Sequence, residues 1–98
     1  MEVTFDDSRL DRLETDARFE GGFSTAIVKS FRKRMQLIRS ADDERIFYEM
    51  RSLNFERLKG DRDHQYSMRL NVQWRLILQM EGTGNDKRVR VMGIEDYH

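Results

Sequence analysis

The 98-residue sequence contains no cysteine and no proline, and it has only six glycines. The absence of cysteine excludes disulfide bonds, thiol nucleophiles and thiolate metal sites. No apolar run approaches the ~18 residues of a transmembrane helix, and residues 1–7 lack the basic and apolar regions of a secretory signal. We therefore expect one small soluble cytoplasmic domain over residues 1–98, with no metal, no cofactor and no membrane partner.

Positive and negative side chains balance, with 18 Lys and Arg against 18 Asp and Glu. The charges are nevertheless segregated. Residues 1–23 hold seven acidic and three basic side chains, whereas residues 24–39 hold five basic and no acidic ones. A neutral total argues against indiscriminate binding to polyanions but permits a local basic site. The basic block has two interpretations: a solvated helix face that forms ion pairs, or a contact to RNA backbone.

The first half of the chain has helical periodicity after a short strand over residues 3–5. A first helix is expected after Asp7 or Ser8, a second from Ser24 or Thr25, and a third after an N-cap within residues 40–43. The apolar residues expected to be buried are Leu10, Leu13 and Ala17 in the first helix, Ile27, Phe31, Met35 and Ile38 in the second, and Ile46, Phe47, Met50 and Leu53 in the third.

The second half changes to a period of two, which is typical of strands. Apolar and polar residues alternate over residues 65–71 and 74–80, and a last strand over residues 89–94 follows the turn-rich residues 82–86. This pattern predicts an antiparallel meander with one apolar face. The fold class is therefore α+β, with N-terminal helices packed on one face of a small antiparallel sheet.

The register of the predicted hairpin brings two arginines together. If residues 71–73 form the loop, Arg69 lies opposite Arg75, and only such a register keeps the apolar residues of both strands on one side. Like charges directly opposite destabilise a sheet by up to ~1 kcal/mol. Two interpretations stay open: the pair binds an anion such as phosphate, or Glu95, Glu56 or another acid neutralises it.

Three blocks of the second half resemble a known toxin family. They are Glu56-Arg57-Leu58-Lys59-Gly60-Asp61-Arg62, residues 65–75, and the terminal Ile94-Glu95-Asp96-Tyr97-His98. Together they resemble the HigB branch of the RelE/ParE toxin superfamily over roughly residues 54–98. The resemblance implies the RelE-like fold and a type II toxin that cleaves mRNA during translation, within the ribosomal A site. It also implies silencing by a HigA-like helix-turn-helix antitoxin, so that operator DNA is met only through the antitoxin complex.

Metal-free RNA cleavage needs a base for the 2′-hydroxyl proton, cations for the crowded phosphate and an acid for the leaving 5′-oxygen. The resemblance assigns these catalytic tasks to Lys59, Arg75, Asp96, Tyr97 and His98. Arg69 and Arg57 are expected to contact the substrate, and Lys33 to contact RNA backbone from the basic block. The general base is open between Glu56, Asp96 and His98.

Each of these residues also has a structural interpretation. Asp96 could pair with Arg75 or Arg90, Lys59 could be a turn cation, and a terminal His98 could be a solvated end.

Two other functions remain as alternatives: a ParE-like inhibitor of DNA gyrase that cleaves no RNA, or a degenerate module that only binds antitoxin and co-represses. The terminal Asp-Tyr-His and the paired arginines favour the nuclease, because a protein that only binds needs no proton-transfer groups.

Overall fold

Three α-helices and five strands form the part of the chain that the computed structural model describes, residues 1–96. The helices are α1 (Ser8–Thr15), α2 (Thr25–Ser40) and α3 (Arg45–Glu49), and the strands are β1 (Glu2–Phe5), β2 (Glu56–Arg57), β3 (Gln65–Arg69), β4 (Trp74–Glu81) and β5 (Arg88–Asp96). Short 3-10 helices cover Arg51–Leu53, Gly60–Arg62 and Gly84–Asp86. Within this part of the chain, no helix has the length and apolar character needed to cross a membrane.

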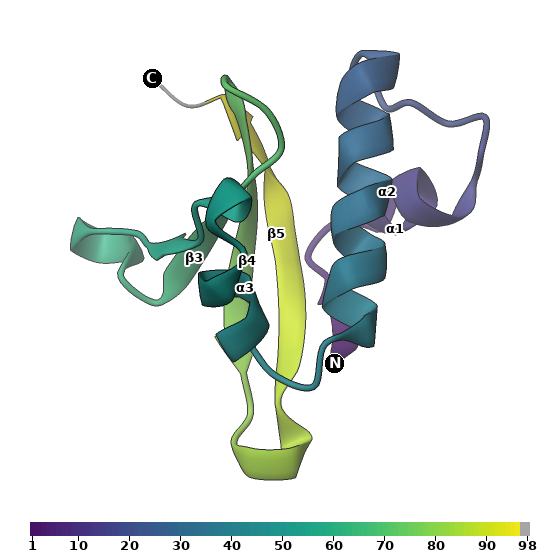
Figure 1. The fold of residues 1–98 in the computed structure, drawn as a ribbon. Coiled ribbons are helices and arrows are strands. Elements are labelled where there is room, and N and C mark those ends of the chain that lie inside the picture. Colours follow the sequence, from purple (N-terminus) through teal and green to yellow (C-terminus); the bar gives the residue numbers. More distant parts are fainter. Residues whose placement is uncertain (97–98) are drawn as a thin grey trace.

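The strands form one sheet in the order β1-β5-β4-β3-β2. Strands β2 to β5 are antiparallel, as predicted, whereas β1 pairs with β5 in the parallel direction. Figure 1 shows α1 and α2 together on one side of this sheet, so the α+β prediction is confirmed. The parallel β1–β5 pair departs from the prediction of an antiparallel sheet. All other elements lie between these two strands in the sequence, so no hairpin forces them to run antiparallel.

The first two helices begin where the sequence predicts, whereas α3 begins at Arg45 after the N-cap residue Glu44, just beyond the predicted residues 40–43. The Asp7 side chain accepts a hydrogen bond from the Arg9 backbone N–H at 2.8 Å, and the Ser24 hydroxyl accepts one from the Ile27 N–H at 3.2 Å, so each satisfies an N–H that has no partner within its helix. The predicted apolar stripe of α2 is buried throughout. Ala17 is exposed, against prediction, because α1 ends at Thr15.

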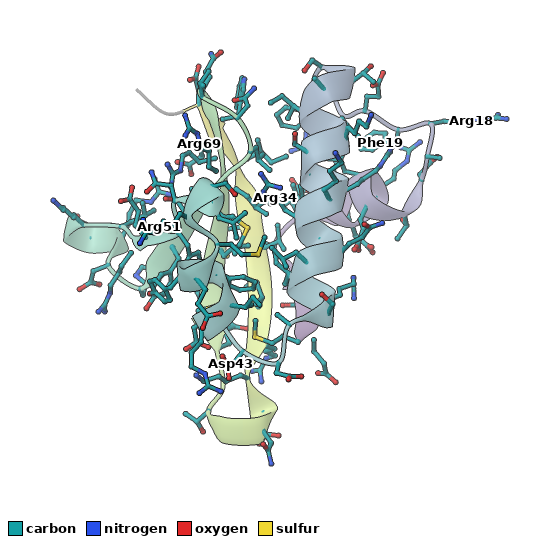
Figure 2. All side chains as sticks on the ribbon, in the orientation of Figure 1. Arg18, Phe19, Arg34, Asp43, Arg51 and Arg69 are labelled. Atoms are coloured by element: carbon teal, nitrogen blue, oxygen red, sulfur yellow. The ribbon has the colours of Figure 1, made fainter. Side chains whose placement is uncertain are left out.

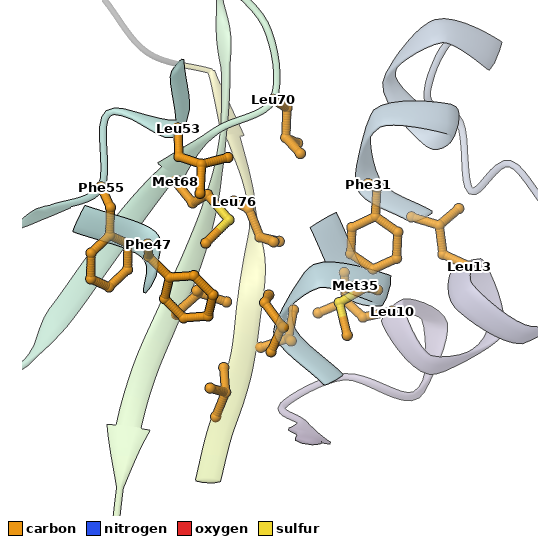
Figure 3. Packing of buried hydrophobic residues seen from close by; sticks show 14 of the residues in the cluster. Leu10, Leu13, Phe31, Met35, Phe47, Leu53, Phe55, Met68, Leu70 and Leu76 are labelled. Carbon is orange, nitrogen blue, oxygen red and sulfur yellow. The ribbon is translucent and has the colours of Figure 1, made fainter. Parts of the chain in front are cut away.

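The third helix is shorter than predicted, and two of the four residues expected to be buried there are exposed. Phe47 and Leu53 are buried, but Ile46 and Met50 are 40% and 38% exposed. The α-helix ends at Glu49, and Met50, with a ψ of 87°, turns the chain into the next 3-10 helix. The apolar stripe is therefore interrupted, and only two of its four members reach the core, where Phe47 and Leu53 pack near Met68 and Leu76 (Figure 3).

The register of the sheet decides which side chains meet on each face. Arg69 pairs with Arg75 and Met68 with Leu76, so the predicted hairpin register is confirmed. In β5 the register shifts: Val91 pairs with Leu78 but Gly93 pairs with Ile77, which leaves Met92 as the extra residue of a β-bulge. Beyond this bulge, Ile94 lies on the helix-covered face, and Gly93 and Glu95 lie on the opposite one.

Candidate functional site

The sheet face away from α1 and α2, called the open face from here on, carries most of the polar residues of the strands. Cross-strand pairing places Glu56 opposite Ser67, Arg69 opposite Arg75, and Arg75 opposite Glu95. Residues directly opposite each other in antiparallel strands point to the same face. These five side chains from four strands therefore share the open face.

Arg75 is the fixed cation of this face. Its side chain is 4% exposed, and its Nη2 donates to the Asn54 carbonyl at 2.6 Å and to the Ser67 Oγ at 2.8 Å. Asn54 adopts a left-handed conformation, with a φ of 46°, directly after the 3-10 helix Arg51–Leu53. A buried guanidinium is costly unless it is hydrogen-bonded. These oxygens therefore hold Arg75 in one orientation before any substrate arrives.

A carboxylate lies beside this cation. The Glu56 Oε1 is 3.7 Å from the Arg75 Nη2, and the Glu56 side chain is about half exposed. That distance exceeds the ~2.7–2.9 Å of a charge-assisted hydrogen bond. Glu56 therefore lies within ion-pair distance of the Arg75 guanidinium and is still accessible to a ligand.

Arg69 lies opposite Arg75 in register, but its guanidinium is held elsewhere. Its Nε donates to the Asn71 carbonyl at 3.1 Å, and its own carbonyl accepts from the Arg34 Nε at 3.0 Å. In Figure 2 Arg34 extends from α2 toward the sheet. Burial lowers the pKa of Arg34. Among residues 1–96, no carboxylate lies within ion-pair distance of Arg69.

An ion pair crosses the open face. Arg62 Nη1 and Nη2 donate to the two Glu95 carboxylate oxygens at 2.9 and 2.7 Å, and Arg62 Nε donates to Gln65 Oε1 at 3.1 Å. Arg62 precedes β3 and Glu95 lies on β5, so the contact spans β3 and β4. Bonding to Glu95 raises the pKa of Arg62. Glu95 therefore neutralises neither arginine of the hairpin.

The chain matches the family described as the RelE-like toxin of the type II toxin–antitoxin system HigB over residues 3–98. The chain belongs to this HigB-like toxin family. The match agrees with the resemblance carried by residues 54–98 and extends it to the helical half.

Solved structures share the fold. A YoeB/ParE toxin from Agrobacterium tumefaciens aligns with a TM-score of 0.65 and 22% identity, with 100% of both chains covered. The YoeB dimer from Staphylococcus aureus aligns with a TM-score of 0.53 and 16% identity, covering 100% of this chain and 97% of that one. No curated protein matches the chain.

The structure brings only part of the predicted site of this HigB-like toxin together. Lys59 is exposed directly before the 3-10 helix Gly60–Arg62. Arg57 lies opposite Tyr66, on the other face from Glu56, and its Nε donates to the Asp63 carbonyl. Lys33 is exposed on α2, and α2 covers the face opposite to Arg75.

The C-terminal residues divide into described and undescribed ones. Asp96 lies opposite Trp74, so it shares a face with Trp74 and not with Arg75, and its Oδ2 accepts from the Gln73 amide at 3.1 Å. Arg90, which the sequence offers beside Arg75 as an alternative partner of Asp96, bonds to Asp6 at 3.1 Å. Tyr97 and His98 lie outside the described residues.

Three contributors to the open face were missed by sequence reasoning: Asn54, Ser67 and Arg62. Ser67 had a usable signal, because it lies two residues before Arg69 on the same strand face. Asn54 and Arg62 had none, because both belong to connections whose path the periodicity does not fix. Within residues 1–96, no group of three or more His, Asp or Glu side chains is placed to hold a metal ion.

Proposed function

We propose that this HigB-like toxin is an endoribonuclease that cleaves translated mRNA in the ribosomal A site by acid–base chemistry of its own side chains. The observation that carries the proposal is the pair on the open face: a fixed guanidinium, Arg75, with an accessible carboxylate, Glu56, 3.7 Å away. Cleavage next to a 2′-hydroxyl needs a proton acceptor beside a cation, and this pair supplies both.

Glu56 is the proposed general base. Its carboxylate removes the proton of the 2′-hydroxyl, and the 2′-oxygen then attacks the adjacent phosphorus. The bond from phosphorus to the 5′-oxygen breaks, which leaves a 2′,3′-cyclic phosphate on one product. Of the two candidates for the base within residues 1–96, Glu56 shares the face of Arg75, whereas Asp96 lies on the other face. The third candidate, His98, lies outside the described residues.

Arg75 is proposed to stabilise the negative charge that develops on the phosphate. Its hydrogen bonds to Asn54 and Ser67 keep it in place, so no reorganisation is needed when the charge develops. Arg69 and the exposed Lys59 would contact the phosphate and its neighbours. The acid for the leaving 5′-oxygen is proposed to be His98, and Tyr97 is proposed to donate a hydrogen bond.

Arg57 and Lys33 fit this arrangement less directly. Arg57 lies on the opposite face of β2, and Lys33 lies on the far helix layer. Their proposed role is contact with RNA backbone away from the scissile bond. The site would act on translating ribosomes in the cytoplasm, and a HigA-like helix-turn-helix antitoxin would silence it and carry it to operator DNA.

The decisive experiment follows mRNA ends by primer extension in a reconstituted translation reaction. Wild type is expected to produce new ends within codons occupying the A site. Glu56→Gln and His98→Ala should each reduce the cleavage rate by about 10²–10⁴-fold, the usual contribution of a general base or acid. Arg75→Ala should reduce the rate by at least about 10²-fold.

Glu49→Gln and Arg18→Ala are the matched controls, because both residues are exposed: Glu49 lies on α3 in a pocket shared with Ser40 and Ala41, and Arg18 extends away from the sheet (Figure 2). Both should cleave at the wild-type rate. Intact mRNA together with inhibited gyrase supercoiling would replace the nuclease by the ParE-like function. Equal growth arrest by wild type and all site variants would also reject the nuclease proposal.

A further inference from the structure

Arg34 of α2 extends across to the end of β3. Its Nε donates to the Arg69 carbonyl at 3.0 Å, a contact between residues 35 positions apart, and its side chain is half-buried (Figure 2). Among residues 1–96, no carboxylate lies within ion-pair distance of Arg34, and neither of its Nη atoms makes a hydrogen bond. Both Nη atoms are reachable from solvent. A half-buried guanidinium without a counter-charge is costly, and an anion bound to it would offset that cost.

The register of the hairpin explains why the Arg69 carbonyl can accept from Arg34. The Leu70 N–H donates to the Trp74 carbonyl, so Leu70 directs its backbone groups toward β4. Arg69, the preceding residue, therefore directs its carbonyl away from β4, toward the sheet edge on which β2 lies. Strand β2 begins at Glu56 and does not reach Arg69. Arg34 thus bonds to the sheet edge at a place where β2 leaves a carbonyl without a strand partner.

Arg69 is a second cation of the same kind. Its Nε donates to the Asn71 carbonyl at 3.1 Å, and within residues 1–96 its Nη atoms have no hydrogen-bond partner. In Arg34 and Arg69, called the tethered arginines from here on, a backbone carbonyl fixes the side chain through Nε. The two-pronged Nη end stays available to a ligand in both, and this end matches two oxygens of a phosphate group.

The tethered arginines continue the positive charge of the open face. Arg69 lies directly opposite Arg75. Since the adjacent residues Leu70 and Trp74 are the hydrogen-bonded pair, Arg69 and Arg75 form a non-hydrogen-bonded pair, in which side chains lie closer together. Arg34 adds a guanidinium at the sheet edge beyond Arg69. The order Arg75, Arg69, Arg34 therefore leads from the proposed catalytic pair to the edge on which β2 lies.

No acid among residues 1–96 neutralises the tethered arginines by contact. Glu95 pairs with Arg62, and Glu56 lies nearest to Arg75. The hairpin loop, residues 71–73, carries no charged side chain. Two guanidinium groups at this end of the sheet therefore lack a contacting carboxylate, which favours a ligand whose negative charges repeat along a chain.

We propose that the tethered arginines bind the mRNA phosphates next to the scissile linkage, with Arg69 on the adjacent phosphate and Arg34 on the one beyond it. The proposal rests on the proposed function in naming mRNA as the ligand, and it adds a phosphate subsite to which α2 contributes. Holding the backbone on one side of the scissile bond presents the scissile phosphate to Arg75 in one position.

The first test is NMR of the arginine Nε–H groups in the full chain, titrated with a short 2′-O-methyl RNA. The methyl group blocks the attacking hydroxyl, so the strand stays intact. The signals of Arg34 and Arg69 are expected to shift and saturate together. Arg32 is the matched control, because it lies on the same helix and its Nε donates to the Leu13 carbonyl at 3.0 Å, so its signal should not move. An unmoved Arg34 signal, or equal shifts of Arg32 and Arg34, would overturn the proposal.

The second test locates the subsite on the strand. Toxin binding is measured on ribosomes that hold a 2′-O-methyl A-site codon, with one mRNA phosphate at a time replaced by an uncharged methylphosphonate. At one linkage this replacement should weaken wild-type binding about tenfold or more, the usual contribution of a hydrogen bond to a charged group, and should leave Arg34→Gln unaffected. Arg34→Gln keeps a side-chain donor for the Arg69 carbonyl. Arg18→Gln removes an equal charge at an exposed position and should respond as wild type does.

The variant can contradict the proposal in two ways. Wild-type affinity in Arg34→Gln for the unmodified codon would exclude Arg34 from the site. Weaker binding of Arg34→Gln with the wild-type loss at every replaced linkage would assign the charge to ribosomal RNA and overturn the mRNA subsite. The NMR titration needs no variant, so it decides the proposal even if Arg34→Gln does not fold.

Neither measurement requires cleavage, so the subsite and the proposed function can fail separately. A toxin that shows the linkage-specific loss through Arg34 but leaves unmodified mRNA intact would retain the subsite and lose the nuclease. Cleavage of mRNA with no linkage that depends on Arg34 would retain the nuclease and overturn the subsite.

Discussion

Arg62 and Glu95 form a two-pronged ion pair that bridges the open face from the β2–β3 connection to β5, with N–O distances of 2.7 and 2.9 Å. Both side chains are close to half exposed. A pair this exposed contributes little stability, about 0–1 kcal/mol. If the proposed function holds, an RNA phosphate is expected to replace Glu95 as the partner of Arg62.

This exchange predicts opposite effects for the two partners. Glu95→Gln should tighten binding of a short single-stranded RNA, because it removes a repelling charge and releases Arg62. Arg62→Gln should weaken binding and lower the slope of log K against log salt by ~0.7, the share of one phosphate contact on a single strand. Fluorescence anisotropy at several salt concentrations measures both.

The Asp7–Arg9 pair at the start of α1 provides the control, since it is also an Arg–carboxylate pair on the surface, with the Arg9 side chain 80% exposed. Arg9→Gln should leave the affinity and the salt slope unchanged. If Arg9→Gln and Arg62→Gln weaken RNA binding equally, the effect belongs to net charge and not to the open face.

Ser67 should stabilise the fold through Arg75. Its Oγ accepts from the buried guanidinium at 2.8 Å, so Ser67→Ala leaves a buried charge with one fewer acceptor. A hydrogen bond to a charged group contributes ~1.5–3 kcal/mol, and urea unfolding should show a loss in this range. Ser52→Ala, at an exposed position, should change the stability by less than ~0.5 kcal/mol.

The basic block of α2 is predicted to be largely structural. Arg32 donates from Nε to the Leu13 carbonyl at 3.0 Å and from Nη2 to the Asp16 carbonyl at 2.9 Å, at the end of α1. Arg32→Ala should therefore lower the free energy of unfolding by ~1–3 kcal/mol, because it leaves these carbonyls without their donor. Lys29→Ala, exposed on the same helix, should have little effect. Equal unfolding midpoints in urea would contradict this role for Arg32.

Asp43 gives a pH-dependent signal at the start of α3. Hydrogen bonds from the Arg45 side chain and backbone lower the pKa of Asp43 from 3.8 to about 2. A lowered folded-state pKa stabilises the fold above pH 3.8, and this contribution is lost as the pH falls through about 2. Carboxyl NMR should give a midpoint near 2 in wild type and a higher one in Arg45→Ala. An unchanged midpoint in the variant would rule out Arg45 as the cause.

The parts of the fold that local periodicity determines were predictable. The buried stripe of α2 follows from helical spacing, and the Arg69–Arg75 register follows from the hairpin loop and the need to keep Met68 and Leu76 on one face. Both depend on residues close in the sequence. The prediction of the third helix failed because the helix ends before Met50, where the sequence has no glycine or proline to mark the end.

The site was predictable only in part, because its contacts join distant segments. Arg75 and Arg69 were found from strand register, and Ser67 could have been found in the same way, whereas the acceptor Asn54 depends on how the 3-10 helix Arg51–Leu53 meets the sheet. The partnership of Arg62 with Glu95 joins residues 33 positions apart, from a loop to a strand. Composition and alternation carry no information on such a pairing.

The bulge at Met92 determines which face of the sheet residues 93–96 present. If Met92 instead paired as a regular strand residue, strict alternation from Val91 would turn Glu95 toward the helices and bring Ile94 and Asp96 to the side of Arg75. A carboxylate would then be buried and an isoleucine exposed to solvent. Deleting Met92, in contrast, should remove the bulge and leave Ile94 toward the helices and Glu95 beside Arg75. A single unpaired residue thus separates the order of these side chains along the sequence from the face that each one occupies.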